Sequence, residues 1–165
     1  MAERLEFQAK KVGVWLYELP TSKLIALALI CTYLAVLPSA IYSMLSNTVE
    51  PLGGPAWGRH DALKMVLLGC IAAPLIETAV IQWGCLRLLG RLGCDTRVAI
   101  CVSALAFGLA HNYSGAYVVF GVAAGLVFAL VFDIEDARNG RPFAVTCAVH
   151  AIRNGLTLVI SLLVR

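Results

Sequence analysis

The segment Ala73-Pro74-Leu75-Ile76-Glu77-Thr78-Ala79-Val80-Ile81-Gln82 lies inside a run, Met65 to Leu86, in which Glu77 is the only formally charged residue. A run of this length can cross a membrane as one α-helix. A charged side chain at the centre of such a helix costs about 2.5–3.5 kcal/mol on insertion scales, so other groups must compensate it. Glu77 is therefore the first candidate functional residue.

The composition places the whole chain in the membrane class. Of its 165 residues 60% are hydrophobic and only 14% charged, and the mean hydropathy is +0.83. Soluble domains carry about 25% charged residues. The net charge of +3 is small and the aromatic residues do not alternate with basic ones, so we expect no binding to nucleic acid. The six cysteines form no CxxC pair and are interpreted as packing residues.

The apolar runs predict an all-α polytopic membrane helical bundle with about five transmembrane helices. The runs are Leu24 to Leu45, Ala62 to Leu89, Val98 to Phe132 and Phe143 to Val164. The third would be about 52 Å long as one helix, against a hydrocarbon core of about 30 Å, so it must fold back. The turn residues Asn112-Tyr113-Ser114-Gly115 predict where it does so.

Residues 1–23 are charged and amphipathic and predict an N-terminal interfacial segment, with a solvated tail as the alternative. Residues 24–165 are expected to form the membrane-embedded domain, with its motif-bearing core at about 73–160. Most of the 13 Lys and Arg residues fall on one side of the predicted spans. The positive-inside rule then predicts a cytoplasmic N-terminus. The small size of the chain favours a prokaryotic cytoplasmic (inner) membrane.

Two later apolar segments carry the residues that could compensate Glu77. Phe107 and His111 are spaced i, i+4, and so are His150 and Asn154, so each pair shares a helix face. Counted from the cytoplasmic helix ends, Glu77 is about 15 Å deep, and His150 and Asn154 about 10 and 16 Å. His111 is about 21 Å deep before tilt. These side chains can therefore meet near mid-membrane.

These residue types suit a hydrolase that activates water. An ionised glutamate can take a proton from water, and a nearby histidine can orient that water. A second histidine and an asparagine amide can donate hydrogen bonds to a developing oxyanion. No Ser, Cys or Asp occupies these positions, which argues against a nucleophilic triad. Zinc held by Glu77 and the two histidines is the second choice, because no HExxH spacing is present.

Three motifs also carry a family resemblance: Pro74-Leu75-Ile76-Glu77, Phe107-x-x-x-His111 and His150-x-x-x-Asn154. In this order they resemble the motifs of the CPBP intramembrane glutamic endopeptidases, the Abi family, which is related to the type II CAAX prenyl protease. The resemblance implies that Glu77 and His111 activate water and that His150 and Asn154 form the oxyanion site. It implies cleavage of a peptide bond within or at the lipid bilayer. We expect no cofactor, with zinc as the second choice.

At two positions the sequence departs from the family pattern. The family's first motif usually has two glutamates and then an arginine four residues after the second, and here Thr78 and Gln82 stand at those positions. We interpret Thr78 and Gln82 as a neutral hydrogen-bonding substitute. As a hypothesis, Arg153 beside His150 supplies the missing positive charge and keeps Glu77 ionised.

The sequence therefore predicts an intramembrane endopeptidase that acts on a membrane-associated protein or peptide. The resemblance implies prenylated C-terminal motifs, bacteriocin-related peptides or C-terminal sorting tails as substrates, and no residue chooses among them. The alternatives are a non-catalytic membrane immunity or scaffold protein, and a small ion-coupled transporter that uses Glu77.

Overall fold

The computed structural model describes residues 14–46 and 61–163. Within these residues every regular element is a helix and there is no strand, which confirms the all-α prediction. The first helices are α2 (Thr21–Leu34) and α3 (Val36–Leu45), and the last are α7 (Thr96–Ala110), α8 (Gly115–Ala137) and α9 (Pro142–Leu163). Most of the predicted interfacial segment lies outside the described residues.

One long helix between Ala62 and Arg91 carries Glu77. It consists of α4 (Ala62–Lys64), the π-helical stretch η2 (Met65–Ala72), α5 (Ala73–Glu77), a second π-helical stretch η3 (Thr78–Gly84) and α6 (Cys85–Arg91). The short α5, which contains both Pro74 and Glu77, is therefore flanked by π-helix on both sides. Such interruptions are uncommon and often occur at functional sites.

Four helices in the described part of the chain are long and apolar enough to cross a membrane: 21–45, 62–91, 115–137 and 142–163. The fifth predicted span corresponds to α7, which has 15 residues and is shorter than a full span. The predicted turn at 112–115 is confirmed, because α7 ends at Ala110 and α8 begins at Gly115. Ser114 caps α8 by accepting a hydrogen bond from the Tyr117 N–H at 3.0 Å.

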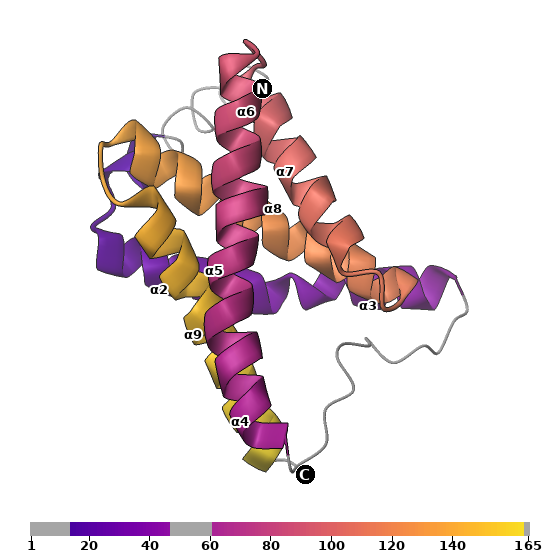
Figure 1. Cartoon of the computed structure of the whole chain (residues 1–165). Helices are drawn as coiled ribbons and strands as arrows, with labels where there is room; N and C mark the ends of the chain where they lie inside the picture. The colour runs from indigo at the N-terminus through magenta and orange to yellow at the C-terminus, as the bar shows by residue number, and fades with distance from the viewer. Residues whose placement is uncertain (1–13, 47–60, 164–165) are drawn as a thin grey trace.

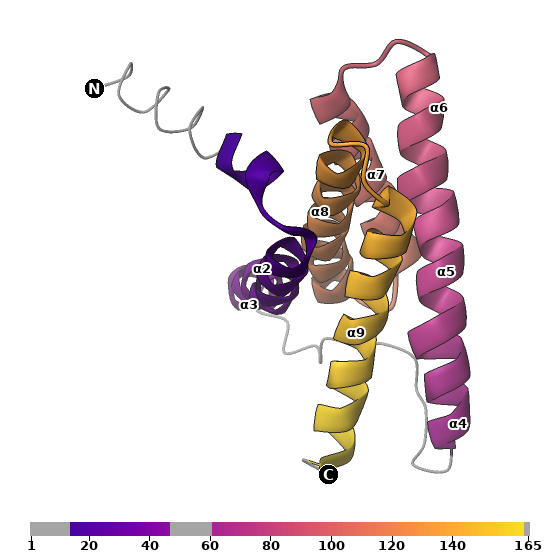
Figure 2. The same cartoon turned by 90° about the vertical axis from the view of Figure 1, so that its left-hand side faces the viewer.

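The N-terminal helices lie crosswise to the long helix. Figure 1 shows α4, α5 and α6 running from bottom to top with α2 and α3 crossing behind them, and Figure 2 views α2 and α3 nearly end on. Contacts at both ends of α8 explain this direction. Thr21 of α2 binds Glu135 near the end of α8, and Tyr42 of α3 packs against Gly115 at its start. The two helices therefore follow α8 in the antiparallel direction.

Helices α7 and α8 approach each other closely at small residues. A Cβ added to Gly121 would lie 2.9 Å from the Cα of Gly108, and one added to Gly125 would lie 2.7 Å from the Cβ of Phe107. Real Cβ atoms do not approach other atoms so closely, so only glycine fits at these positions. Gly121 and Gly125, spaced i, i+4, thus allow the end of α7 to pack directly on α8.

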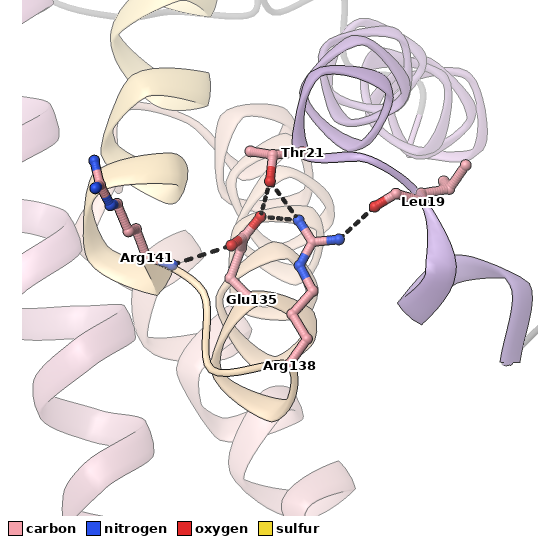
Figure 3. Close-up of polar contacts among 5 residues, drawn as sticks. All are labelled: Leu19, Thr21, Glu135, Arg138 and Arg141. Carbon is pink, nitrogen blue, oxygen red and sulfur yellow. Dashed lines mark hydrogen bonds and ion pairs between the residues drawn. The ribbon is translucent and has the colours of Figure 1, made fainter.

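A buried carboxylate joins the start of α2 to the turn between α8 and α9 (Figure 3). Glu135 is 1% exposed and accepts hydrogen bonds from the Thr21 hydroxyl at 3.1 Å and the Arg141 N–H at 3.1 Å. It also pairs with Arg138, whose guanidinium donates to the Leu19 carbonyl. We call these five residues the Glu135 clasp. It holds the N-terminal helices against α8 and α9.

Candidate active site

Glu77 lies where three helices meet, and one of its oxygens faces two histidines. Its Oε2 atom is 3.6 Å from Nε2 of His111 at the end of α7 and 3.8 Å from Nε2 of His150 on α9. The structure thus brings together three side chains that lie far apart in the sequence, as we expected. Both distances exceed a normal hydrogen bond.

The group is largely, but not fully, buried. The side chain of His150 is 5% exposed, whereas those of His111 and Glu77 are 18% and 23% exposed. The Oε2 atom of Glu77, which faces both histidines, is itself buried, so the exposed part of this side chain lies outside the contact with the histidines. His150 forms the inner wall of the site.

The hydrogen bonding of His111 defines which of its nitrogens carries hydrogen. Its Nδ1 atom is 2.7 Å from the carbonyl oxygen of Phe107. A carbonyl only accepts, so Nδ1–H is the donor. In the neutral ring Nε2 is then the basic nitrogen, and it is the atom that faces Glu77. Glu77 and His111 can therefore share one proton. Phe107 also stacks on the His111 ring with centroids 4.5 Å apart, which fixes the orientation of the imidazole.

Aromatic rings hold His150 in place. Its ring stacks on Phe128 of α8 with centroids 4.5 Å apart and meets Phe107 edge-on at 5.6 Å. Its Nδ1 atom is buried and has no hydrogen-bond partner among the described residues. The Nε2 side is the one turned to Glu77. Phe107, which the sequence analysis named as a supporting residue, thus contacts both histidines.

Asn154 contacts the backbone of the long helix. Its Nδ2 atom donates to the carbonyl oxygen of Gly69 in η2 at 2.8 Å, and its Oδ1 accepts from Arg153 at 3.3 Å. This bond to Gly69 was not foreseen from the sequence. A side chain that pairs with a backbone carbonyl leaves no pattern in the sequence.

Arg153 does not meet Glu77 as we had hypothesised. None of the ion pairs among residues 14–46 and 61–163 joins Arg153 to a carboxylate. Its guanidinium lies 4.7 Å from the centroid of the Phe120 ring and 5.9 Å from that of Tyr33. Cation–π contacts to α8 and α2 therefore stabilise its charge.

Thr78 and Gln82 lie beside Glu77 on η3 and are fully buried. Neither the Thr78 hydroxyl nor the Gln82 amide has a hydrogen-bond partner in the described part of the chain. The expected neutral substitute for an ion pair is thus not hydrogen-bonded. Thr146, one turn before His150 on α9, is likewise fully buried with an unpartnered hydroxyl. Thr146 was not among the residues predicted for the site, although its i, i+4 spacing places it on the same face of the helix as His150.

A metal-binding group and a cavity are two further features that bear on this site. No group of three or more His, Cys, Asp or Glu side chains in the described ranges is arranged to hold a metal ion. An open cavity of about 550 Å³ lies between α6, α7 and α8, where Arg87 pairs with Asp136. None of the predicted site residues lines it.

Long apolar helices around the largely buried Glu77–His111–His150 group are typical of an integral membrane protein. A family model described as type II CAAX prenyl endopeptidase Rce1-like matches residues 59–156, more than half of the chain. The protein therefore belongs to this family of membrane proteases, and the resemblance seen in the sequence is confirmed. No curated protein and no solved structure matches the chain.

Proposed function

We propose that the protein is an intramembrane endopeptidase in which Glu77 and His111 activate a water molecule for attack on a peptide bond. The observation that carries this proposal is the approach of two imidazole Nε2 atoms, at 3.6 and 3.8 Å, to the same oxygen of Glu77. The substrate is a membrane-associated protein or peptide, as family membership suggests.

The reaction follows from the protons that these groups can hold. The Glu77 carboxylate takes a proton from water as the water oxygen attacks the carbonyl carbon. The Nε2 atom of His111, which is basic in its neutral tautomer, shares that proton. The C–N bond then breaks as the proton passes to the leaving nitrogen. One proton of the water thus reaches the new amine, and the other stays with the oxygen that becomes part of the new carboxyl group. The enzyme returns to its starting state.

His150 is suited to stabilise the oxyanion. Its Nδ1 atom is buried among aromatic rings without a partner, which favours the tautomer that carries hydrogen on Nε2. That N–H points into the site and can donate to the developing negative charge. Family resemblance would make the Asn154 amide a second donor, but in the structure this amide donates to the Gly69 carbonyl instead.

The test is cleavage of a membrane-peptide library by the purified, detergent-solubilised protein. Glu77→Gln is expected to lower kcat at least about 100-fold, because it removes the base. Glu18→Gln, in the short helical stretch at residues 14–18 where Glu18 is exposed, is the matched control and is expected to behave like wild type. Activity is expected to survive an excess of chelator. Loss of activity with chelator would instead favour zinc held by Glu77, His111 and His150.

The unpartnered Thr78 and Gln82 favour one second candidate, a non-catalytic membrane scaffold. In the family these positions usually carry a charged pair, and a chain without it could keep the fold and lose the reaction. Well-folded wild-type protein that cleaves no member of the library would support this candidate. In that case Glu77→Gln and His150→Ala would leave the biological function unchanged.

A further inference from the structure

Pro74 interrupts the hydrogen bonding of the helix three residues before Glu77. At the end of η2 the Ala73 N–H donates to the Leu68 carbonyl, a spacing of five residues. If this pattern, in which each N–H donates to the carbonyl five residues earlier, continued by one residue, residue 74 would donate to the carbonyl of Gly69. Proline has no N–H, so the backbone offers the Gly69 carbonyl no donor in this pattern.

Asn154 donates to that same carbonyl. Its Nδ2 atom lies 2.8 Å from the Gly69 oxygen, and the two residues are 85 positions apart in the chain. The orientation of the amide is unambiguous, because a carbonyl oxygen requires a donor and the amide oxygen already accepts from Arg153. Gly69 is half-buried in a helix that is long and apolar enough to cross a membrane, where little water is available to replace the missing donor.

We propose that Asn154 is a positioning residue that supplies the hydrogen-bond donor missing at Pro74. It fixes the change from π-helix to α-helix at Ala73 and Pro74, and so sets where Glu77 lies relative to His111 and His150. The same helix, α9, carries His150 one turn earlier, so a single helix positions both the carboxylate and one of its histidines. The catalytic part of this inference rests on the proposed function, whereas the structural part does not.

Ser103 provides a matched comparison. It reaches from α7 to the Ile81 carbonyl of η3, with Oγ donating at 3.0 Å. Both side chains thus bind a carbonyl in a π-helical stretch from a neighbouring helix. Only the Gly69 carbonyl stands five residues before a proline, so only Asn154 is expected to be coupled to Pro74.

The experiment is a double-mutant cycle between Asn154→Leu and Pro74→Ala, read as apparent Tm in detergent and as kcat and KM. Asn154→Leu alone is expected to lower the Tm by about 3–6 °C, the effect of one carbonyl left without a donor in an apolar helix. It is expected to lower kcat about tenfold with KM nearly unchanged, because Glu77 shifts by a small amount. Pro74→Ala restores a backbone N–H, so the double variant is expected to return close to Pro74→Ala alone in both readouts.

The control cycle pairs Ser103→Ala with Pro74→Ala, and its effects on Tm are expected to add. If Pro74→Ala fails to rescue Asn154→Leu in Tm, the inference is wrong. Rescue of Tm without rescue of kcat would overturn the positioning role and return Asn154 to the oxyanion site. Should Asn154→Leu not fold, Asn154→Ala serves in its place. Should wild type not cleave peptides, the proposed function fails while the Tm cycle still decides the structural part.

Discussion

The imidazole ring of His150 stacks on the ring of Phe128, with centroids 4.5 Å apart and an interplanar angle of 25°. Helix α8 thus fixes the orientation of a site residue on α9 through an apolar contact. His150 has no hydrogen-bond partner at Nδ1 in the described residues, so this stack replaces the hydrogen bond that usually orients a histidine.

Replacing Phe128 with leucine is expected to lower kcat about tenfold while KM stays nearly constant, since the His150 ring gains freedom to turn. Phe132→Leu is the control. Phe132 is also about 1% exposed on α8 but makes no ring contact with His150. Both variants are expected to lose about 1–2 kcal/mol of stability. Equal kcat for the two variants would show that the stack does not orient His150.

Removing the charge of the Glu135 clasp is expected to destabilise the protein without changing the chemistry of the site. Glu135→Gln leaves the guanidinium of Arg138 without its buried partner and is expected to cost about 3 kcal/mol. Thr21→Val removes two hydrogen bonds, one donated to the Glu135 carboxylate and one accepted from the Arg138 guanidinium, and is expected to cost about 1–2 kcal/mol because the ion pair itself remains. Urea or thermal unfolding in detergent measures both. A Glu135→Gln variant no less stable than Thr21→Val would contradict the buried ion pair.

The close contact of α7 and α8 predicts opposite effects of the same substitution at two glycines. Gly125→Ala adds a Cβ that would lie 2.7 Å from Phe107, so it is expected to cost about 1–2 kcal/mol and to reduce activity by moving His111. Gly90→Ala meets no atom within 4 Å and is expected to be neutral or stabilising by up to about 1 kcal/mol. Thermal unfolding of the two variants tests this pair.

The buried amide of Gln82 is expected to lower the stability of the chain. Gln82→Met keeps a similar volume and removes two polar atoms that have no partner in the described residues. It is therefore expected to raise the free energy of unfolding by about 1 kcal/mol. A loss of stability would mean instead that the amide is satisfied in the membrane by groups such as bound water. The measurement is reversible unfolding in detergent or lipid.

The sequence was sufficient for the features that depend on local pattern. The apolar runs located the helices, Asn112 to Gly115 located the turn, and residue counts along each helix gave both histidines a depth comparable to that of Glu77. Each of these follows from hydrophobicity or helical period along one segment. The membrane orientation and the roles of the site residues stay predictions.

Features that depend on contacts between segments were not accessible. The crosswise direction of α2 and α3 results from Thr21 and Tyr42 meeting opposite ends of α8. Arg153 was expected beside Glu77 because it shares a helix with His150. Its guanidinium instead lies over aromatic rings of α2 and α8. Helical spacing says which residues share a face, but not which neighbouring helix that face meets.

The two π-helical stretches have a consequence for insertions and deletions in this chain. Successive residues of an α-helix are rotated by about 100° around the helix axis. The direction in which a side chain points therefore depends on the number of residues in each preceding turn. The wide turns of η2 set the phase at which Glu77 emerges toward α7 and α9. Tightening of all eight residues of η2 into α-helix would rotate the carboxylate away from the histidines, whereas loss of one residue in the same stretch would largely compensate that rotation. The direction of Glu77 thus depends on the number of residues in η2 and on its wide turns together.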